Sequence, residues 1–281
     1  MIRFERTGLP TTCEPSWKES EGVAYPVKDI EECLRLAVEL ARRAGDLTLQ
    51  WFQRDDLVID TKGDGTPVTQ ADRAAERFLR GELAERFPRD GILGEEDGED
   101  AGQSGRRWII DPIDGTKPFT HGVPLYSNLL ALLDDDGPAV GVINLPALGL
   151  TVAAGRGLGC FANGERVAVS DRPDGGLAGA MIMTSGIETW SSPQIEALQG
   201  AGGRLRTWGD AYGYALVAMG RVDAMVDPIA ALWDLAPMPV ILAEAGGHFR
   251  NVNGDDDPAG GNGIGASSRR VAEELSRILQ R

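Results

Sequence analysis

The residues best suited to chemistry gather in the segment from Trp108 to Phe119, which reads Trp-Ile-Ile-Asp-Pro-Ile-Asp-Gly-Thr-Lys-Pro-Phe. Its apolar start predicts a buried strand, and Asp111 and Asp114 are expected on a tight turn where that strand ends. Carboxylate oxygens that converge on one point are the ligands that hard cations prefer. The hydroxyl of Thr116 could then hold a water molecule on the metal. The same residues also suit an ordinary solvated turn, so the segment alone leaves both interpretations open.

Three further acidic residues stand where predicted elements begin or end. Asp72 lies in the first turn of a predicted helix, Glu95 directly follows a short predicted strand, and Asp234 starts a helix predicted over 234–245. Each position has an ordinary explanation by itself, because carboxylates stabilise helix N-termini and acidic runs are commonly solvated. An anionic phosphate ester would approach so many carboxylates only if metal ions lay between them, and two such ions can bind both the attacking and the leaving oxygen.

Apolar periodicity over the rest of the chain predicts a mixed α/β protein. Helical spacing predicts an amphipathic helix over 28–53 and a second helix that Thr69 caps. Between 125 and 170, short strands joined by turns such as Asn163-Gly164 predict an antiparallel meander, and beyond it strands and helices alternate. The segment 171–179 breaks the pattern and is the expected boundary. It separates an α+β half with most of the acidic sites, 28–172, from an α/β half, 173–281. A loosely ordered extension, 1–27, is expected before them.

The composition narrows the classes of partner. The 281 residues include 43 acidic and 28 basic side chains, for a net charge of -15. Such a chain repels nucleic-acid phosphates and anionic lipids, so neither is an expected partner. No apolar run reaches membrane-spanning length, and the N-terminus lacks the apolar core of a signal peptide. The cysteines at 13, 33 and 160 are odd in number and scattered, which predicts free thiols in a reducing cytoplasm.

Three separated motifs resemble the signature segments of the inositol monophosphatase family. They are Gly94-Glu95-Glu96, then Asp111-Pro112-Ile113-Asp114-Gly115-Thr116, then Trp233-Asp234 with Glu244-Ala245-Gly246-Gly247. The resemblance covers roughly residues 28 to 281. It implies a layered αβαβα fold of the sugar-phosphatase type, a Mg²⁺-dependent phosphomonoesterase activity and a homodimer.

The resemblance also implies which residues bind the metal. Glu95, Asp111 and the backbone carbonyl of Ile113 would hold one Mg²⁺. A second Mg²⁺ would lie between Asp111, Asp114 and Asp234, and a third, weaker ion would share Glu95. Two or three ions per active site are therefore expected.

The water and the phosphate have their own implied partners. Asp72 and Thr116 would orient and deprotonate the attacking water, with Glu95 assisting through the metal. Asp114, Gly115 and Thr116 would line the phosphate, the last two through their N–H groups if they open a helix. A covalent aspartyl-phosphate route needs Asp-x-Asp-x-Thr, whereas the two aspartates here are three residues apart. Direct attack by water is therefore predicted.

The pocket segments Thr207-Trp208-Gly209-Asp210 and Lys117 to Pro124 resemble the histidinol-phosphatase branch more than the inositol branch. Histidinol phosphate carries an ammonium group and an imidazole, so Asp210 and Asp227 are expected at the cation and Trp208 against the ring. The ordinary alternatives are a core aromatic at 208 and a helix N-cap at 210. L-histidinol phosphate is the predicted substrate. The alternatives are an inositol-1-phosphate or broad sugar-phosphate phosphatase, and a metal-binding protein without catalysis.

Two prolines depart from the family pattern after Asp234. Pro237 fits the first turn of the predicted helix, but Pro239 would remove a helical hydrogen bond or shift the start of the helix. The sequence therefore leaves the placement of Asp234 open.

Overall fold

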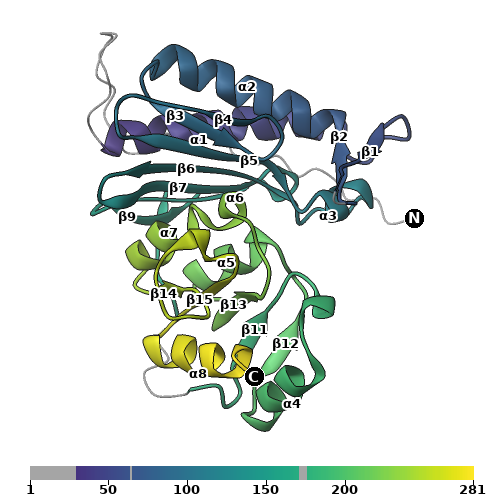
Figure 1. The fold of residues 1–281 in the computed structure, drawn as a ribbon, viewed down its shortest axis with the longest axis vertical. Coiled ribbons are helices and arrows are strands. Elements are labelled where there is room, and N and C mark those ends of the chain that lie inside the picture. The colour runs from purple at the N-terminus through teal and green to yellow at the C-terminus, as the bar shows by residue number, and fades with distance from the viewer. Residues whose placement is uncertain (1–29, 64, 171–175) are drawn as a thin grey trace.

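Helices and sheets alternate in layers through residues 30–63, 65–170 and 176–281, which the computed structural model describes (Figure 1). Two long helices cover one face of an eight-stranded sheet, and three shorter helices separate its other face from a five-stranded sheet that two outer helices cover. This order confirms the predicted αβαβα fold. From the first layer to the last, the helices are α1 (Ile30–Leu49) and α2 (Gln70–Arg86), then α5 (Ala211–Ala218), α6 (Leu232–Leu235) and α7 (Met238–Glu244), then α4 (Ser192–Gly200) and α8 (Arg269–Leu279).

The first half is built as its apolar periodicity predicts. The helix expected over 28–53 is α1, whose described start is Ile30, and α2 is capped at Thr69, whose hydroxyl accepts a hydrogen bond from the Ala71 N–H. None of the described helices is long and apolar enough to cross a membrane. The strands of this half are β1 (Ile59–Thr61), β2 (Pro67–Thr69), β3 (Gly91–Gly94), β4 (Gly98–Asp100), β5 (Arg107–Asp114), β6 (Ser127–Asp134), β7 (Gly137–Leu145), β8 (Leu150–Gly155), β9 (Gly159–Ala162) and β10 (Glu165–Val167).

The large sheet has the order β10-β9-β8-β7-β6-β5-β3-β4. Adjacent strands of this sheet pair antiparallel, except β3 and β5, which run parallel. Strands β6 to β10 form the meander predicted between 125 and 170. A short helix, α3 (Thr116–Thr120), follows β5 directly. Strand β5, which carries Trp108, Asp111 and Asp114, therefore lies inside the sheet, with β3 on one side and β6 on the other.

The second half forms a mixed sheet with the order β12-β11-β13-β15-β14. The predicted helix over 234–245 is instead two helices, α6 and α7, which part at Ala236 and Pro237. Pro237 precedes α7 and Pro239 lies in its first turn, where a missing N–H costs no helical hydrogen bond. Asp234 thus belongs to a separate short helix. The strands and 3-10 turns are β11 (Met181–Met183), β12 (Arg204–Arg206), β13 (Ala224–Asp227), β14 (His248–Arg250), β15 (Gly263–Ala266), η1 (Pro146–Leu148), η2 (Ile187–Thr189) and η3 (Pro258–Gly260).

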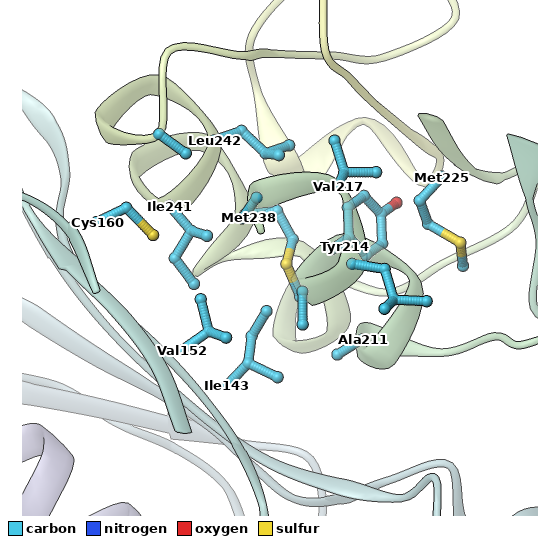
Figure 2. Close-up of a cluster of buried hydrophobic side chains, with 14 of the residues drawn as sticks. Ile143, Val152, Cys160, Ala211, Tyr214, Val217, Met225, Met238, Ile241 and Leu242 are labelled. Carbon is cyan, nitrogen blue, oxygen red and sulfur yellow. The ribbon is translucent and has the colours of Figure 1, made fainter. Parts of the chain in front are cut away.

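A large apolar cluster joins the two halves. Ile143 and Val152 of the large sheet pack with Tyr214 of α5 and with Met238 and Ile241 of α7 (Figure 2). Burial of this many apolar side chains stabilises the contact, at about 25 cal/mol for each Å² removed from water. Residues 171–175 of the expected boundary and the extension at 1–27 lie outside the described residues. The shared core keeps the two halves in register, as a site built from both halves requires.

Candidate active site

Asp111 and Asp114 both lie within β5, and not on a turn after it as the sequence suggests. Asp111 pairs with Leu129 and Asp114 with Ser127, so the register of β5 against β6 shifts between them. Side chains three apart in a regular strand point to opposite faces of the sheet. The bulge removes this constraint, because it changes the direction of the strand locally. It therefore brings the two carboxylates to one place.

Asp234 of the second half completes a cluster with these two residues. One carboxylate oxygen from each of Asp111, Asp114 and Asp234 lies within 4.8 Å of the other two. The Oδ2 atom of Asp234 accepts a hydrogen bond of 2.7 Å from the Ala231 N–H at the start of α6. The ordinary helix-terminus role and a place in the cluster therefore coexist at this residue.

Burial makes the cluster strongly unfavourable for negative charge. Burial first, and then the charges of Glu95 and Asp114, raise the pKa of Asp111 well above its usual range. Burial and the charges of Asp210 and Asp234 do the same for the pKa of Asp114. Burial also raises the pKa of Asp234 to about 6. Carboxylates in this position need a nearby positive charge if they are to stay ionised at neutral pH.

The donor set fits a divalent cation. The Oδ1 atom of Asp111 is buried without a hydrogen-bond partner. Among the described residues, no lysine or arginine forms an ion pair with Asp111, Asp114 or Asp234. An unpaired buried carboxylate oxygen is costly, and oxygen-rich sites of this kind suit Mg²⁺. Asp114 is held in place from the other side, since its Oδ2 accepts hydrogen bonds from the Ser127 hydroxyl at 2.7 Å and the Ala211 N–H at 2.8 Å.

Glu95 lies beside the cluster but is not one of the three residues whose oxygens lie within 4.8 Å of one another. Its Oε1 is 2.8 Å from the Nζ of Lys62, which also approaches Glu96 at 2.6 Å. Burial acts to lower the pKa of Lys62, but the two glutamates raise it. The charge of Glu95 nevertheless reaches the cluster, because it contributes to the raised pKa of Asp111. The Glu95 side chain also lies within hydrogen-bonding reach of Asp111, so the two carboxylates predicted to share a Mg²⁺ are neighbours, while Lys62 pairs with Glu95.

Asp72 and Thr116 meet at the edge of the cluster. The Oδ2 of Asp72 accepts hydrogen bonds from the Thr69 N–H at 2.8 Å and the Thr69 hydroxyl at 2.5 Å, while its Oδ1 lies 3.4 Å from the Thr116 hydroxyl. The same hydroxyl is 3.2 Å from the carbonyl oxygen of Ile113. Burial raises the pKa of Asp72 to about 6. One oxygen of Asp72 thus caps α2, and the other faces the site.

Gly115 connects the strand to α3 in a left-handed conformation, with φ of 81°. This conformation strains any residue that carries a side chain, and a Cβ atom there would also lie 2.8 Å from the Oδ2 of Asp210. Gly115 is the N-cap of α3 and Thr116 is its first residue, so the condition set for their N–H groups, that they open a helix, is met. The same contact shows that the Asp210 carboxylate comes against the phosphate-binding segment predicted from the sequence.

Two of the residues predicted to contact substrate, Asp210 and Asp227, form a second acidic group beside the three aspartates. Ser185 joins them, since its hydroxyl donates to Asp227 at 2.6 Å and accepts from the Asp210 N–H at 3.1 Å. Burial raises the pKa of Asp227 to about 7, and burial also raises the pKa of Asp210. Asp210 stands at the N-cap position of α5 but makes no capping hydrogen bond through its side chain. Trp208 is 46% exposed, so it is not a core aromatic.

Several residues of the site carry no sequence signal of their own. Ser127, Lys62 and the Ala211 N–H bind carboxylates from segments whose proximity only the tertiary structure creates. Glu76 is different, because it stands four residues after Asp72 on α2 and therefore on the same helix face. The spacing of four residues from Asp72 was the available clue that Glu76 is a second buried carboxylate on α2 at this site.

Glu76 holds the segment that carries Glu95. Its side chain is fully buried and accepts hydrogen bonds from the Glu96 N–H at 2.8 Å, the Asp97 N–H at 3.0 Å and the Arg80 guanidinium at 2.8 Å. The amide of Glu76→Gln can accept through one oxygen only, so one N–H loses its charge-assisted partner. We expect the Mg²⁺ concentration for half-maximal activity to rise by about tenfold.

Steady-state assays across a Mg²⁺ series measure this effect. Glu82→Gln is the matched control, because Glu82 also lies on α2 but pairs with Arg43 and Arg86 at the surface. An unchanged Mg²⁺ requirement in Glu76→Gln, or an equal rise in both variants, would show that Glu76 does not position Glu95.

Comparison with known proteins places this arrangement in a family. The model of the inositol monophosphatase family matches residues 29–281. The histidinol-phosphatase of Chlorobaculum parvum is 42% identical over 245 residues, which cover 86% of this chain and 94% of that protein. The inositol-1-monophosphatase of Rhizobium meliloti is 34% identical over 258 residues, covering 88% and 96%. The solved structure of the extragenic suppressor protein suhB from Bartonella henselae matches with a TM-score of 0.81 at 30% identity, covering 89% of this chain and 99% of that one. The chain therefore belongs to the inositol monophosphatase family, whose members hydrolyse phosphate monoesters.

Proposed function

We propose that this protein is a Mg²⁺-dependent phosphatase that hydrolyses L-histidinol phosphate to L-histidinol and phosphate. The observation that carries the proposal is the convergence of Asp111, Asp114 and Asp234 within 4.8 Å, next to the acidic group of Asp210 and Asp227. The first group suits a cation that can receive phosphate, and the second suits an ammonium group on the same small molecule.

The metal fits the residues that are present. Asp111, Asp114 and Asp234 would hold one Mg²⁺, and Glu95 would join Asp111 at a second once it leaves Lys62. Bound Mg²⁺ supplies Lewis-acid charge that stabilises the phosphoryl group and lowers the pKa of a bound water. The three aspartates would remain ionised under that charge, and the family resemblance favours two or three ions.

The chain's own contribution to water attack lies at Asp72 and Thr116. The Oδ1 of Asp72 is the oxygen left free by the cap of α2, and the Thr116 hydroxyl lies 3.4 Å from it. A water molecule between these groups would donate its proton toward Asp72 Oδ1 as its oxygen approaches phosphorus. General-base assistance of this kind contributes about 10²- to 10⁴-fold to rate. Attack by water leaves no covalent link between the phosphate and the enzyme.

The second acidic group favours a cationic substrate. Asp210 lies against Gly115, and its charge raises the pKa of Asp114, so a group bound to Asp210 stands close to the phosphate site. Its backbone has φ of 53°, a strained conformation for a residue other than glycine, and such strain concentrates at functional sites. Trp208, two residues earlier and half exposed, could stack on an imidazole ring. The greater identity to a histidinol-phosphatase than to an inositol-1-monophosphatase supports the same choice.

Assays of several phosphate esters, with the unaltered protein and with the Asp210→Asn variant, test which ester is the substrate. We expect L-histidinol phosphate to exceed inositol 1-phosphate in kcat/KM, and Asp210→Asn to lower kcat/KM for L-histidinol phosphate by about a hundredfold, because a charged partner is lost. Hydrolysis of p-nitrophenyl phosphate, which has no ammonium group, should change by less than about threefold in this variant. Glu188→Gln is the control, since this exposed carboxylate acts on Asp210 only through its charge.

The opposite result would assign the protein to the inositol or sugar-phosphate alternative. In that opposite result, kcat/KM is clearly higher for inositol 1-phosphate than for L-histidinol phosphate, and Asp210→Asn lowers kcat/KM equally for all substrates. The homodimer implied by the family resemblance and the cytoplasmic location suggested by the cysteines remain predictions.

A further inference from the structure

A row of buried polar side chains crosses the large sheet next to the active site. Asn128 of β6 lies directly opposite Asn144 of β7, which lies directly opposite Thr151 of β8. All three are buried. The next row on the same face is apolar and packs into the core beneath α1 and α2; its members are Leu130, Val142 and Ala153. Polar groups at the end of an otherwise apolar face cost stability unless each one is hydrogen-bonded.

Each member of the row is hydrogen-bonded, and the bonds run in one direction. The Arg42 Nε donates to the Thr151 hydroxyl at 3.1 Å, and that hydroxyl donates to the Asn144 Oδ1 at 3.0 Å. The Asn144 Nδ2 donates to the Asn128 Oδ1 at 3.0 Å, and the Asn128 Nδ2 donates to the Pro112 carbonyl at 2.6 Å. A guanidinium can only donate, so it fixes the direction of the bonds that follow. The row therefore ends with an amide N–H₂ directed at Pro112.

Pro112 lies in the bulge between the two metal-site aspartates. No strand pairing of β5 with β6 includes Pro112 or Ile113, because the register shifts between Asp111 and Asp114. Proline has no N–H, and the bulge leaves its carbonyl without a ladder partner. The side chain of Asn128 replaces that missing partner. Ser127, the preceding residue of β6, holds Asp114 from the opposite face of the strand.

Helix α1 is shaped to admit the row. A Cβ atom at Gly45 would lie 2.4 Å from the Asn144 Nδ2 and 2.9 Å from the Asn128 Oδ1, so only glycine leaves room for both amides. The Asn144 Nδ2 also donates to the Ala41 carbonyl of the same helix at 3.0 Å. Asn144 thus has two partners that fix its orientation, Ala41 and Thr151, and it holds Asn128 in turn.

We propose that Asn128 is a positioning residue that fixes the Asp111–Asp114 bulge in the conformation that binds Mg²⁺. The inference rests on the proposed function, because it concerns the same cation site. The side-chain hydrogen bonds of Asn128 go to Pro112 and Asn144, and neither carboxylate is among their partners. It acts through the Pro112 carbonyl, which lies between the two residues whose side chains must converge. Without this hydrogen bond, the bulge loses the contact that opposes its return to a regular strand, where the aspartates would face opposite ways.

Two substitutions separate positioning from general stability. Asn128→Leu keeps a similar volume and removes two hydrogen bonds, including the one to Pro112. Thr151→Val keeps the shape of the side chain and also removes two hydrogen bonds of the row, but Asn144 keeps its bond to Ala41 and Asn128 stays in place. Calorimetric titration of Mg²⁺ into the metal-free protein gives the affinity directly, and kcat and KM give a second measure.

The expected result is a loss of Mg²⁺ affinity of about tenfold or more in Asn128→Leu, in the range found when outer partners of metal ligands are removed. Thr151→Val should stay within about twofold of the unaltered protein. The kcat of Asn128→Leu at limiting Mg²⁺ should fall, with KM for the ester little changed. Circular dichroism checks folding, and Asn128→Ser, whose hydroxyl is too short to reach Pro112, replaces the leucine variant if that variant does not fold.

Two outcomes would overturn the inference. One is Mg²⁺ affinity within twofold of the unaltered protein when Asn128 is replaced. The other is an equal loss in the Asn128 and Thr151 variants, which would reduce the row to a contribution to stability. Failure of the proposed Mg²⁺ dependence gives a different result, because the unaltered protein itself would then bind no Mg²⁺ in the titration, whereas a wrong substrate assignment would leave Mg²⁺ binding unchanged.

Discussion

Replacing Asp111 with Asn should abolish ester hydrolysis and leave the fold intact. Asp111 is the residue whose buried Oδ1 lacks any hydrogen-bond partner, and it stands between Asp114 and Glu95 in the predicted metal sites. An amide is a weak ligand for Mg²⁺ and carries no charge. We expect kcat/KM to fall by at least about a thousandfold, or about 4 kcal/mol, within the several kcal/mol that a bound metal supplies.

Thermal unfolding of the metal-free proteins provides an independent measurement. Burial and neighbouring carboxylates raise the pKa of Asp111, which means that its negative charge is unfavourable in the folded protein. The metal-free Asn variant should therefore unfold at the same temperature as the unaltered protein or higher. Addition of Mg²⁺ should stabilise the unaltered protein and have little effect on the variant.

Asp223→Asn is the matched control for Asp111→Asn. Asp223 is also a buried aspartate, but it accepts a hydrogen bond of 2.8 Å from the Met181 N–H in the second sheet, away from the site. This control should lose stability and keep its activity. Activity within tenfold of the unaltered protein in Asp111→Asn would contradict the metal-centred account.

Replacing Asp72 with Asn should lower kcat by about 10²- to 10⁴-fold with little change in KM or in the Mg²⁺ requirement. The amide oxygen can still accept the hydrogen bond from the Thr69 N–H that caps α2, so the helix keeps its start. The amide N–H₂ would face Thr116 and could not take a proton from water. Steady-state kinetics at saturating Mg²⁺ measures the change in kcat.

The Thr69→Ala variant distinguishes the role of Asp72 as a proton acceptor from its role in capping α2. It removes the hydroxyl that donates to Asp72 but keeps the carboxylate, so it should cost about 1 kcal/mol of stability and leave kcat nearly unchanged. A kcat for Asp72→Asn within threefold of the unaltered protein would exclude Asp72 as the proton acceptor. A rise in the Mg²⁺ requirement equal to the loss in kcat would instead assign Asp72 to metal binding.

Local periodicity was enough to predict most of the architecture. The apolar spacing of α1 and α2, the cap at Thr69 and the alternating strands of the meander depend on nearby residues, so the sequence specifies them directly. The helix expected over 234–245 was wrong in one respect, because Pro237 separates α6 from α7. The prolines were visible in the sequence, but whether they would shift, kink or divide the helix depended on packing against the rest of the fold.

The acidic residues of the site were predictable, whereas their geometry was not. Asp111 and Asp114 were expected on a turn, but they lie in a strand whose bulge depends on its register with β6. Glu95 was expected at the metal, and its pairing with Lys62 brings together segments more than thirty residues apart. The polar row that ends at Asn128 has no regular spacing along the chain, since its members become neighbours only when three strands pair.

Phosphate release from L-histidinol phosphate, followed as free Mg²⁺ is restored to chelator-treated protein, tests the central claim most directly. If the buried carboxylates of the two halves hold the cation that hydrolysis requires, the treated protein releases no phosphate above background, and Mg²⁺ restores release in a saturable manner. Undiminished release by protein that retains no divalent metal would contradict the account.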